Sequence, residues 1–120
     1  MQTQMLGILH PGNMGISIAA SAQNSGCEVY WVAENRSPQT RQRAEKHGLR
    51  DAGILARLCD TCAVIVSVCP PHAAEQVASD VLDQGFTGTY LDANAISPQR
   101  AVRIGEKLER AGIRFVDGGI

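Results

Sequence analysis

The chain has 120 residues, a length that suits a single domain. Hydrophobic residues make up 44% of it and charged residues 19%, which is typical of a soluble globular domain and excludes a disordered chain. Eleven Lys and Arg residues stand against twelve Asp and Glu, so the net charge of −1 offers no strong field to attract nucleic acid or an anionic membrane.

No segment predicts a membrane or secreted protein. No apolar run approaches the ~20 residues of a membrane-spanning helix, and the first residues lack the basic and apolar regions of a signal peptide. We therefore expect a cytoplasmic protein whose four cysteines are reduced thiols. Aromatic residues, at 4%, also disfavour a module that stacks on bases. We expect neither a nucleic-acid nor a membrane partner.

Short apolar runs typical of β-strands alternate with helical segments. The strands are expected at residues 5–9, 29–33, 63–68, 89–93 and 114–116, with a further short strand near Leu49. The run 63–68 is apolar on both alternating faces, which predicts a central strand of a parallel sheet. The order β-α-β-α-(β)-α-β-α-β-α-β predicts an α/β fold, a doubly wound, mostly parallel sheet with helices on both faces.

The expected helices carry clear start and stop signals. They cover residues 14–25 and 74–82, and two more begin after the Ser-Pro pairs at 37–38 and 97–98. Ser37 and Ser97 each supply an N-cap hydroxyl that is followed by proline at the first helical position. Gly26, Gly85 and Gly112 stand where three of these segments end, as is usual for the residue after a helix.

A glycine-containing turn follows the first strand. It matches the pattern G-x-G-x-x-G with histidine in the first position, and its residues are His10, Pro11, Gly12, Asn13, Met14 and Gly15. In this pattern the second glycine lets the backbone approach a pyrophosphate, the third lets helix and strand pack closely, and the helix N-terminus attracts the phosphates. We predict a Rossmann-type dinucleotide site formed by these six residues. Because His10 precedes a proline, we expect it to be extended. Gly12 and Gly15 could also serve the turn and its packing without any ligand.

Residues after the second expected strand bear on the choice between NAD and NADP. Glu34 lies near the expected distance of about 20 residues from the turn, where a carboxylate binds the ribose hydroxyls of NAD. Arg36 and Ser37 follow, and a guanidinium binds a 2′-phosphate strongly. We favour NADP, with NAD as the alternative. Arg41 and Arg43 are expected to be solvated residues of a charged helix start.

The cysteines spell a possible metal motif, C-x-x-C…C-x-x-H, over Cys59, Cys62, Cys69 and His72. The strand expected between the two pairs separates them by roughly 20 Å, so we predict no metal site. A thioredoxin-like redox role for Cys59 and Cys62 has no neighbouring group that lowers a thiol pKa. We expect structural cysteines.

Four ordered motifs resemble the β-hydroxyacid dehydrogenases, a family that includes 6-phosphogluconate dehydrogenase and 3-hydroxyisobutyrate dehydrogenase. The motifs are residues 7–15, 68–71, 92–98 and 115–119, so the resemblance covers essentially the whole chain. It implies an oxidoreductase that transfers hydride between NAD(P) and a β-hydroxy acid or a related carbonyl or imine. It also implies two domains, an N-terminal Rossmann domain and an all-helical domain that supplies the dimer contacts.

The resemblance assigns further site residues. Val68, Cys69 and Pro70 would pass beside the nicotinamide. Asn94 stands where the family usually has a serine that contacts cofactor or substrate, and an amide both donates and accepts. Ser97 is either a substrate contact or only an N-cap.

The catalytic lysine of the family lies beyond the residues that match here. We therefore expect no catalytic residue in this chain, and we expect residues 1–120 to be the cofactor domain of a longer protein that forms a homodimer. Two other functions remain open: a non-catalytic nucleotide-sensing or interaction module with the same fold, and a methyltransferase-like domain that binds S-adenosylmethionine. Glu34 is compatible with the latter, whereas Arg36 and Ser37 oppose it.

Overall fold

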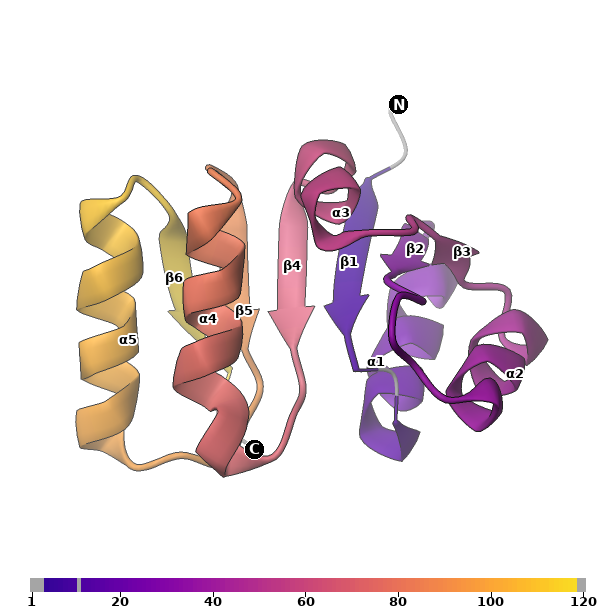
Figure 1. The fold of residues 1–120 in the computed structure, drawn as a ribbon, viewed down its shortest axis with the longest axis horizontal. Helices are drawn as coiled ribbons and strands as arrows, with labels where there is room; N and C mark the ends of the chain where they lie inside the picture. The colour runs from indigo at the N-terminus through magenta and orange to yellow at the C-terminus, as the bar shows by residue number, and fades with distance from the viewer. Residues whose placement is uncertain (1–3, 11, 119–120) are drawn as a thin grey trace.

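The computed structural model describes residues 4–10 and 12–118. Within them, six strands form one parallel sheet in the order β3-β2-β1-β4-β5-β6 (Figure 1). The strands are β1 (Met5–Leu9), β2 (Glu28–Trp31), β3 (Arg50–Asp51), β4 (Val64–Ser67), β5 (Thr89–Asp92) and β6 (Arg114–Asp117). The predicted doubly wound α/β fold is confirmed, and the weak strand expected near Leu49 is β3, at the edge of the sheet. The apolar run at 63–68 forms β4, which lies between β1 and β5.

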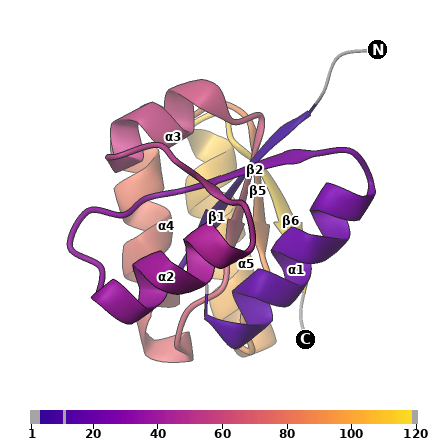
Figure 2. The ribbon, with the colours of Figure 1, turned by 90° about the vertical axis from the view of Figure 1, so that its right-hand side faces the viewer.

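Helices cover both faces of the sheet. They are α1 (Asn13–Asn24), α2 (Pro38–Lys46), α3 (Leu55–Thr61), α4 (Ala74–Asp83) and α5 (Pro98–Arg110), and a short 3-10 turn η1 (Pro71–Ala73) precedes α4. The chain moves outward from β1 first toward β3 and later toward β6. Right-handed crossovers in opposite directions place helices on opposite faces. Figure 2 accordingly shows α1 on one side of the strands and α3 and α4 on the other.

Alternating side chains of the strands divide the core into two layers. In β1, Ile8 packs with the cluster that includes Ala19 of α1 and Ala44 of α2, whereas Leu9 packs with the cluster of α3, α4 and α5. Ile65 and other strand residues are fully buried, and each such aliphatic side chain contributes about 1.5–3 kcal/mol through its burial. The sheet is thereby fixed from both faces, and the ends of its strands have defined positions.

The predicted helix signals are confirmed. The Ser37 hydroxyl accepts a hydrogen bond from the Thr40 amide at 3.2 Å, and the Ser97 hydroxyl accepts one from the Arg100 amide at 3.3 Å. Both serines are followed by proline at the start of the helix. α1 differs, because Gly12 is its N-cap and, among the side chains that the structure describes, none caps its first turn.

The strand order reverses between β1 and β4, since the segment after β1 crosses one face and the segment after β4 crosses the other. In open α/β sheets, ligands bind outside the carboxyl ends of the strands at this point. The predicted phosphate turn follows β1, and the predicted nicotinamide loop follows β4. The fold therefore brings both segments to one edge.

Candidate functional site

A cavity of about 650 Å³ lies at the carboxyl ends of β1, β4 and β5. Four segments line it: the turn after β1 (His10, Gly12, Met14, Gly15), the region after β2 (Arg36, Thr40, Arg43), the loop after β4 (Val68, Cys69, Pro70, Pro71) and the loop after β5 (Ala93, Asn94, Ala95). Nine residues predicted for the site thus lie around one cavity. Pro11 lies outside the described residues. Asn13 begins α1, and its side chain is likewise not described.

His10 does not have the extended conformation expected before a proline. Its φ is 61°, in the left-handed region, so this prediction was wrong. The chain must turn between β1 and α1, and the His10 carbonyl accepts a hydrogen bond from the Gly12 amide at 2.7 Å. Histidine is among the non-glycine residues that are enriched at positive φ. The geometry of the turn has overridden the local preference.

The two glycines of the turn have different surroundings. A Cβ at Gly12 would meet no atom within 4 Å, whereas a Cβ at Gly15 would lie 3.1 Å from the His10 carbonyl oxygen and 3.6 Å from the Ile8 side chain. Gly15 therefore allows α1 to pack closely on β1, and Gly12 leaves open space at the uncapped start of α1. Free N–H groups at a helix start attract anions. This end of the cavity fits a pyrophosphate.

Arg36 and its neighbours form the other end of the cavity. Arg36 Nη2 lies 3.4 Å from His10 Nε2, and among the described residues its buried Nε has no hydrogen-bond partner. Arg43, expected to be solvated, lines the cavity together with Thr40, one turn earlier on α2. Ser37 does not line the cavity; its hydroxyl caps α2 and lies 3.0 Å from Thr40 Oγ1. Two guanidinium groups and a hydroxyl therefore line this end of the cavity.

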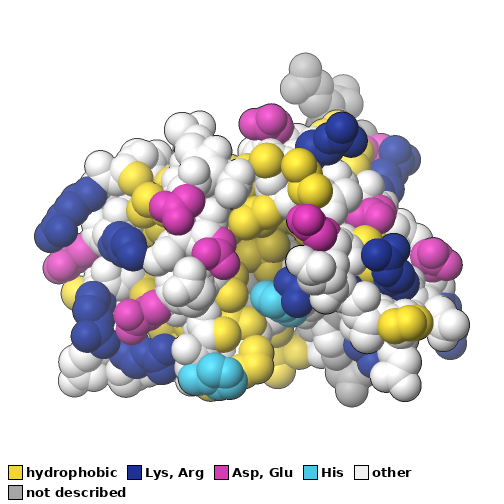
Figure 3. Space-filling view, in the orientation of Figure 1, with side chains coloured by type: hydrophobic (Ala, Val, Ile, Leu, Met, Phe, Trp, Pro, Cys, Tyr) yellow, Lys and Arg dark blue, Asp and Glu magenta, His cyan; other side chains and the backbone are white. Residues whose placement is uncertain are grey.

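A second cavity of about 360 Å³ adjoins the first, since His10 and Arg36 line both. Its apolar walls are Leu9, Val32, Leu55 and Val77, and Glu34, Asn35 and Asp80 also line it. Figure 3 shows a hollow with hydrophobic side chains on its floor and charged side chains around it, between α4 and the region of α2. Glu34 is exposed at this cavity and does not line the first. The site therefore offers an apolar slot beside the cationic cluster.

Asn94 connects the loops after β4 and β5. It is 3% exposed; its Oδ1 accepts from the Cys69 amide at 2.6 Å, and its Nδ2 donates to Ser67 Oγ at 3.1 Å. The backbone N–H of Asn94 donates to Asp92 Oδ1 at 2.8 Å. Burial raises the pKa of Asp92. The Asn94 side chain thus lines the cavity and holds its wall in place.

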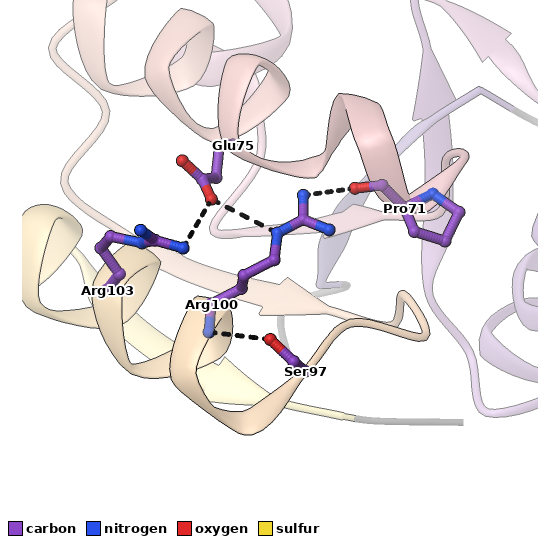
Figure 4. Close-up of polar contacts among 5 residues, drawn as sticks. All are labelled: Pro71, Glu75, Ser97, Arg100 and Arg103. Carbon is purple, nitrogen blue, oxygen red and sulfur yellow. Dashed lines mark hydrogen bonds and ion pairs between the residues drawn. The ribbon is translucent and has the colours of Figure 1, made fainter.

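Arg100 fixes the same wall from outside (Figure 4). Its Nη2 donates to the Pro71 carbonyl at 2.6 Å, and its Nε lies 3.4 Å from Glu75 Oε1, which Arg103 also contacts at 3.4 Å. Ser97, whose hydroxyl caps this helix start, does not line the cavity. Arg100 and Asn94 together tie the loop after β4 to the segment that begins α5.

The two halves of the possible metal motif lie at opposite ends of β4, with Cys59 and Cys62 before it and Cys69 and His72 after it. In the part of the chain that the structure describes, no group of three His, Cys, Asp or Glu side chains could hold a metal ion. The four cysteines are free. Burial raises the pKa of Cys59 to about 11 and that of Cys62 to about 12.

Thiol labelling tests this arrangement. At pH 8 the thiolate fraction of Cys59 and Cys62 is about a thousandth or less, and both side chains are buried. We expect a maleimide to modify Cys27 and Cys69 in the native protein at least tenfold faster, and to modify all four equally in urea. Mass spectrometry of peptides gives the rates. Native labelling of Cys62 as fast as that of Cys27 would contradict the structure.

The sequence pattern located most of the cavity but missed part of it. Thr40 and Arg43 are three residues apart on α2 and so share a face, a spacing that could have indicated their common orientation. The second cavity had no such signal, because its walls come from β1, the loop after β2, α3 and α4.

No helix among the described residues has the length and apolar character needed to cross a membrane.

Comparisons with solved structures support the fold. A conserved protein of unknown function, structurally similar to 3-hydroxyacid dehydrogenases, is 28% identical, with a TM-score of 0.81 over 94% of this chain and 42% of that chain. The 3-hydroxyisobutyrate dehydrogenase of Mycobacterium tuberculosis, solved with L-serine, is 20% identical, with a TM-score of 0.83 over 95% and 39%. An imine reductase variant from Myxococcus stipitatus, in complex with NAD+, is 19% identical, with a TM-score of 0.83 over 100% and 41%.

The chain thus spans about two fifths of the length of these structures. No curated protein matches it. A family model, however, matches residues 5–120, nearly the whole chain, and includes the turn after β1 and the loops after β4 and β5. The resemblance to the β-hydroxyacid dehydrogenases is confirmed, and the chain belongs to the family of the NAD-binding domain of 6-phosphogluconate dehydrogenase.

Proposed function

We propose that this chain is the NADP-binding domain of an oxidoreductase that transfers hydride to or from a β-hydroxy acid or a related carbonyl or imine. The observation that carries the proposal is the cavity itself. An uncapped helix start at Gly12 faces one part of it and a cationic cluster at Arg36 another. A pyrophosphate and a 2′-phosphate need these two features.

The residues present fit each part of the dinucleotide. The turn from His10 to Gly15 would hold the pyrophosphate. The apolar slot at Val32 and Val77 would take the adenine, and the loop at Cys69 would pass beside the nicotinamide. When bound, the dinucleotide supplies or accepts the hydride, while the protein binds and orients it and excludes water. Asn94, buried at the cavity wall, would orient the loop at Cys69 and contact cofactor or substrate.

The preference for NADP rests on Arg36. Its guanidinium lies at the cavity with an unpartnered Nε, whereas Glu34, the residue expected to favour NAD, is exposed at the neighbouring slot. Thr40 and Arg43 add a hydroxyl and a second guanidinium to the lining. A phosphate on the adenosine ribose would find several donors here. NAD is the alternative.

In the intact protein, we propose that this domain works with an all-helical domain, which supplies the general acid/base and the contacts of a homodimer. The chain itself would then bind NADP without turnover. The second candidate is a non-catalytic nucleotide-sensing or interaction module with the same fold, because the fold alone does not determine the function. Calorimetric titration of the chain with NADP+, NAD+ and S-adenosylmethionine tests the proposal by comparing their affinities. The proposal requires NADP+ to bind most tightly.

Arg36→Ala should separate the two dinucleotides. A charge-assisted hydrogen bond contributes about 1.5–3 kcal/mol, so we expect NADP+ affinity to fall by about 10- to 100-fold. NAD+ affinity should change by less than about twofold, because NAD+ lacks the 2′-phosphate. Arg110→Ala is the matched control, since it removes the same charge from an exposed position outside the cavity. An equal loss for both dinucleotides would exclude a 2′-phosphate role for Arg36.

A further inference from the structure

His10 puts an imidazole where the glycine pattern has only a hydrogen atom. Its side chain is partly buried, and it lines both the phosphate end of the first cavity and the apolar slot of the second. The residue also keeps a left-handed backbone, with φ of 61°, which is unfavourable for a non-glycine residue. A glycine would avoid that cost, so the imidazole has a role that the backbone does not explain.

The imidazole contacts Arg36. His10 Nε2 lies 3.4 Å from Arg36 Nη2, and the two side chains come from residues that are 26 positions apart in the sequence. Arg36 is always charged, so Nε2 serves as the acceptor and the imidazole is neutral in this arrangement. The buried Nε of Arg36 has no hydrogen-bond partner among the described residues. The His10 imidazole and the Arg36 guanidinium, both of which can carry a positive charge, thus lie side by side, and the Arg36 Nε can still donate a hydrogen bond.

Among the described residues, no carboxylate forms an ion pair with His10 or Arg36. Glu34 and Asp80 line the second cavity, but both are exposed, and Asp80 accepts a hydrogen bond from Gln76. On the side of the first cavity lie Arg43 and the positive start of α1. Burial, and after it the charge of Arg36, lowers the pKa of His10. A multiply charged anion that entered here would reverse the second effect.

We infer that His10 and Arg36 together form the seat of the 2′-phosphate, and that His10 takes up a proton from solvent when this phosphate binds. The inference rests on the proposed function and adds a second phosphate ligand to it. In the free protein Nε2 accepts from Arg36. In the complex the protonated ring donates through the same nitrogen to a phosphate oxygen, and Arg36 turns its own donors to the phosphate. No bond other than the N–H bond forms or breaks.

Proton linkage fixes the sign of the effect. The free protein holds His10 neutral at pH 7, where the 2′-phosphate of free NADP+ is mostly a dianion, and the bound phosphate favours the charged ring, so the complex binds more protons than its components. The contribution of His10 therefore raises NADP+ affinity as pH falls between its two pKa values, by up to about tenfold per pH unit, and protonation of the free phosphate opposes it toward pH 6. NAD+ brings no 2′-phosphate, and its affinity should depend little on pH through this residue.

Two variants keep the fold while they remove the imidazole. Asparagine and glycine both accept a positive φ, so His10→Asn and His10→Gly should keep the melting temperature of the wild type or raise it. His10→Asn retains a neutral polar side chain that cannot be protonated, so it tests the role of the proton while a polar group stays in place. His10→Gly removes the contact with Arg36 altogether.

The experiment is isothermal titration calorimetry of the chain with NADP+ and with NAD+, in pairs of buffers of different ionisation enthalpy, from pH 6 to pH 8. The dependence of the apparent enthalpy on the buffer gives the number of protons taken up. We expect the wild type to take up a substantial fraction of one proton per NADP+ and far less per NAD+. In His10→Asn this excess should disappear, and the ratio of NADP+ affinity to NAD+ affinity at pH 6.5 should fall about tenfold.

An excess uptake that persists in His10→Asn would assign the proton to another group and overturn the inference. Equal uptake with NAD+ would also overturn it, because the proton would then follow the pyrophosphate. In both cases the dinucleotide site would stand. If neither dinucleotide bound the wild type, the proposed function would fail and the inference with it, so the two failures are distinguishable.

Discussion

Replacing Gly12 by aspartate is expected to abolish dinucleotide binding without harming the fold. Apart from its two neighbours in the chain, no described residue has an atom within 4 Å of a Cβ at this position, so the new side chain has room to enter the phosphate end of the cavity. There its carboxylate would repel the pyrophosphate, and a like-charge contact of this kind costs several kcal/mol. We expect NADP+ and NAD+ affinities to fall more than about 100-fold, as measured by calorimetry.

The helix makes this substitution informative. Gly12 is the N-cap of α1 and has an extended backbone, and aspartate is at least as favourable as glycine at an N-cap. The melting temperature of Gly12→Asp should therefore equal or exceed that of the wild type. Gly12→Asn, a similar side chain without charge, should lose less affinity. Undiminished dinucleotide binding in Gly12→Asp would show that the pyrophosphate does not bind at the start of α1.

Replacing Asn94 by leucine should cause a large loss of stability. Asn94 is 3% exposed, and removal of its amide leaves the Cys69 N–H without its partner and the Ser67 hydroxyl with only the Cys69 sulfur, 3.7 Å away. Each buried polar group that loses its partner costs about 1–3 kcal/mol. We expect the free energy of unfolding in urea to fall by about 2–4 kcal/mol and the melting temperature by about 10 °C or more.

Two further variants show whether that loss of stability comes from the hydrogen bonds of Asn94. Asn24→Leu makes the same chemical change at an exposed position, where substitutions typically alter stability by less than about 0.5 kcal/mol. Asn94→Ser introduces the residue that the family usually has and should be milder than Asn94→Leu, because its hydroxyl can still bond locally. An Asn94→Leu protein as stable as the wild type would show that the amide does not hold the two loops together.

The regular elements were predictable because burial leaves a strong pattern in the sequence. A strand such as β4, covered on both faces, is a continuous apolar run, and α5 repeats buried residues at Ala101, Ile104 and Leu108. The Ser-Pro starts of α2 and α5 are local signals with a local cause. α3 was expected only as part of the element order, and Ile54 at its N-cap provides no capping hydroxyl. Its limits come from tertiary packing.

The site was predictable as far as one segment determines its own geometry. The turn at residues 10–15 and the loop at 68–70 were located by their motifs. The left-handed backbone of His10 was not, because the hydrogen bond from Gly12 and the approach of Gly15 oppose the preference of a residue before proline. The contact of His10 with Arg36 joins residues 26 positions apart. No local pattern encodes it.

The two borders of the sheet differ in what they offer another polypeptide. β3 is only two residues long and both are exposed, and Arg50 is engaged with Glu28, so it presents little surface for a foreign strand. β6 is twice as long, has a strand on one side only within the described residues, and exposes Val116. Such a border is open to backbone pairing, and charged residues at both its ends, Arg114 and Asp117, discourage flat stacking of copies. Self-association of the purified domain would begin along β6.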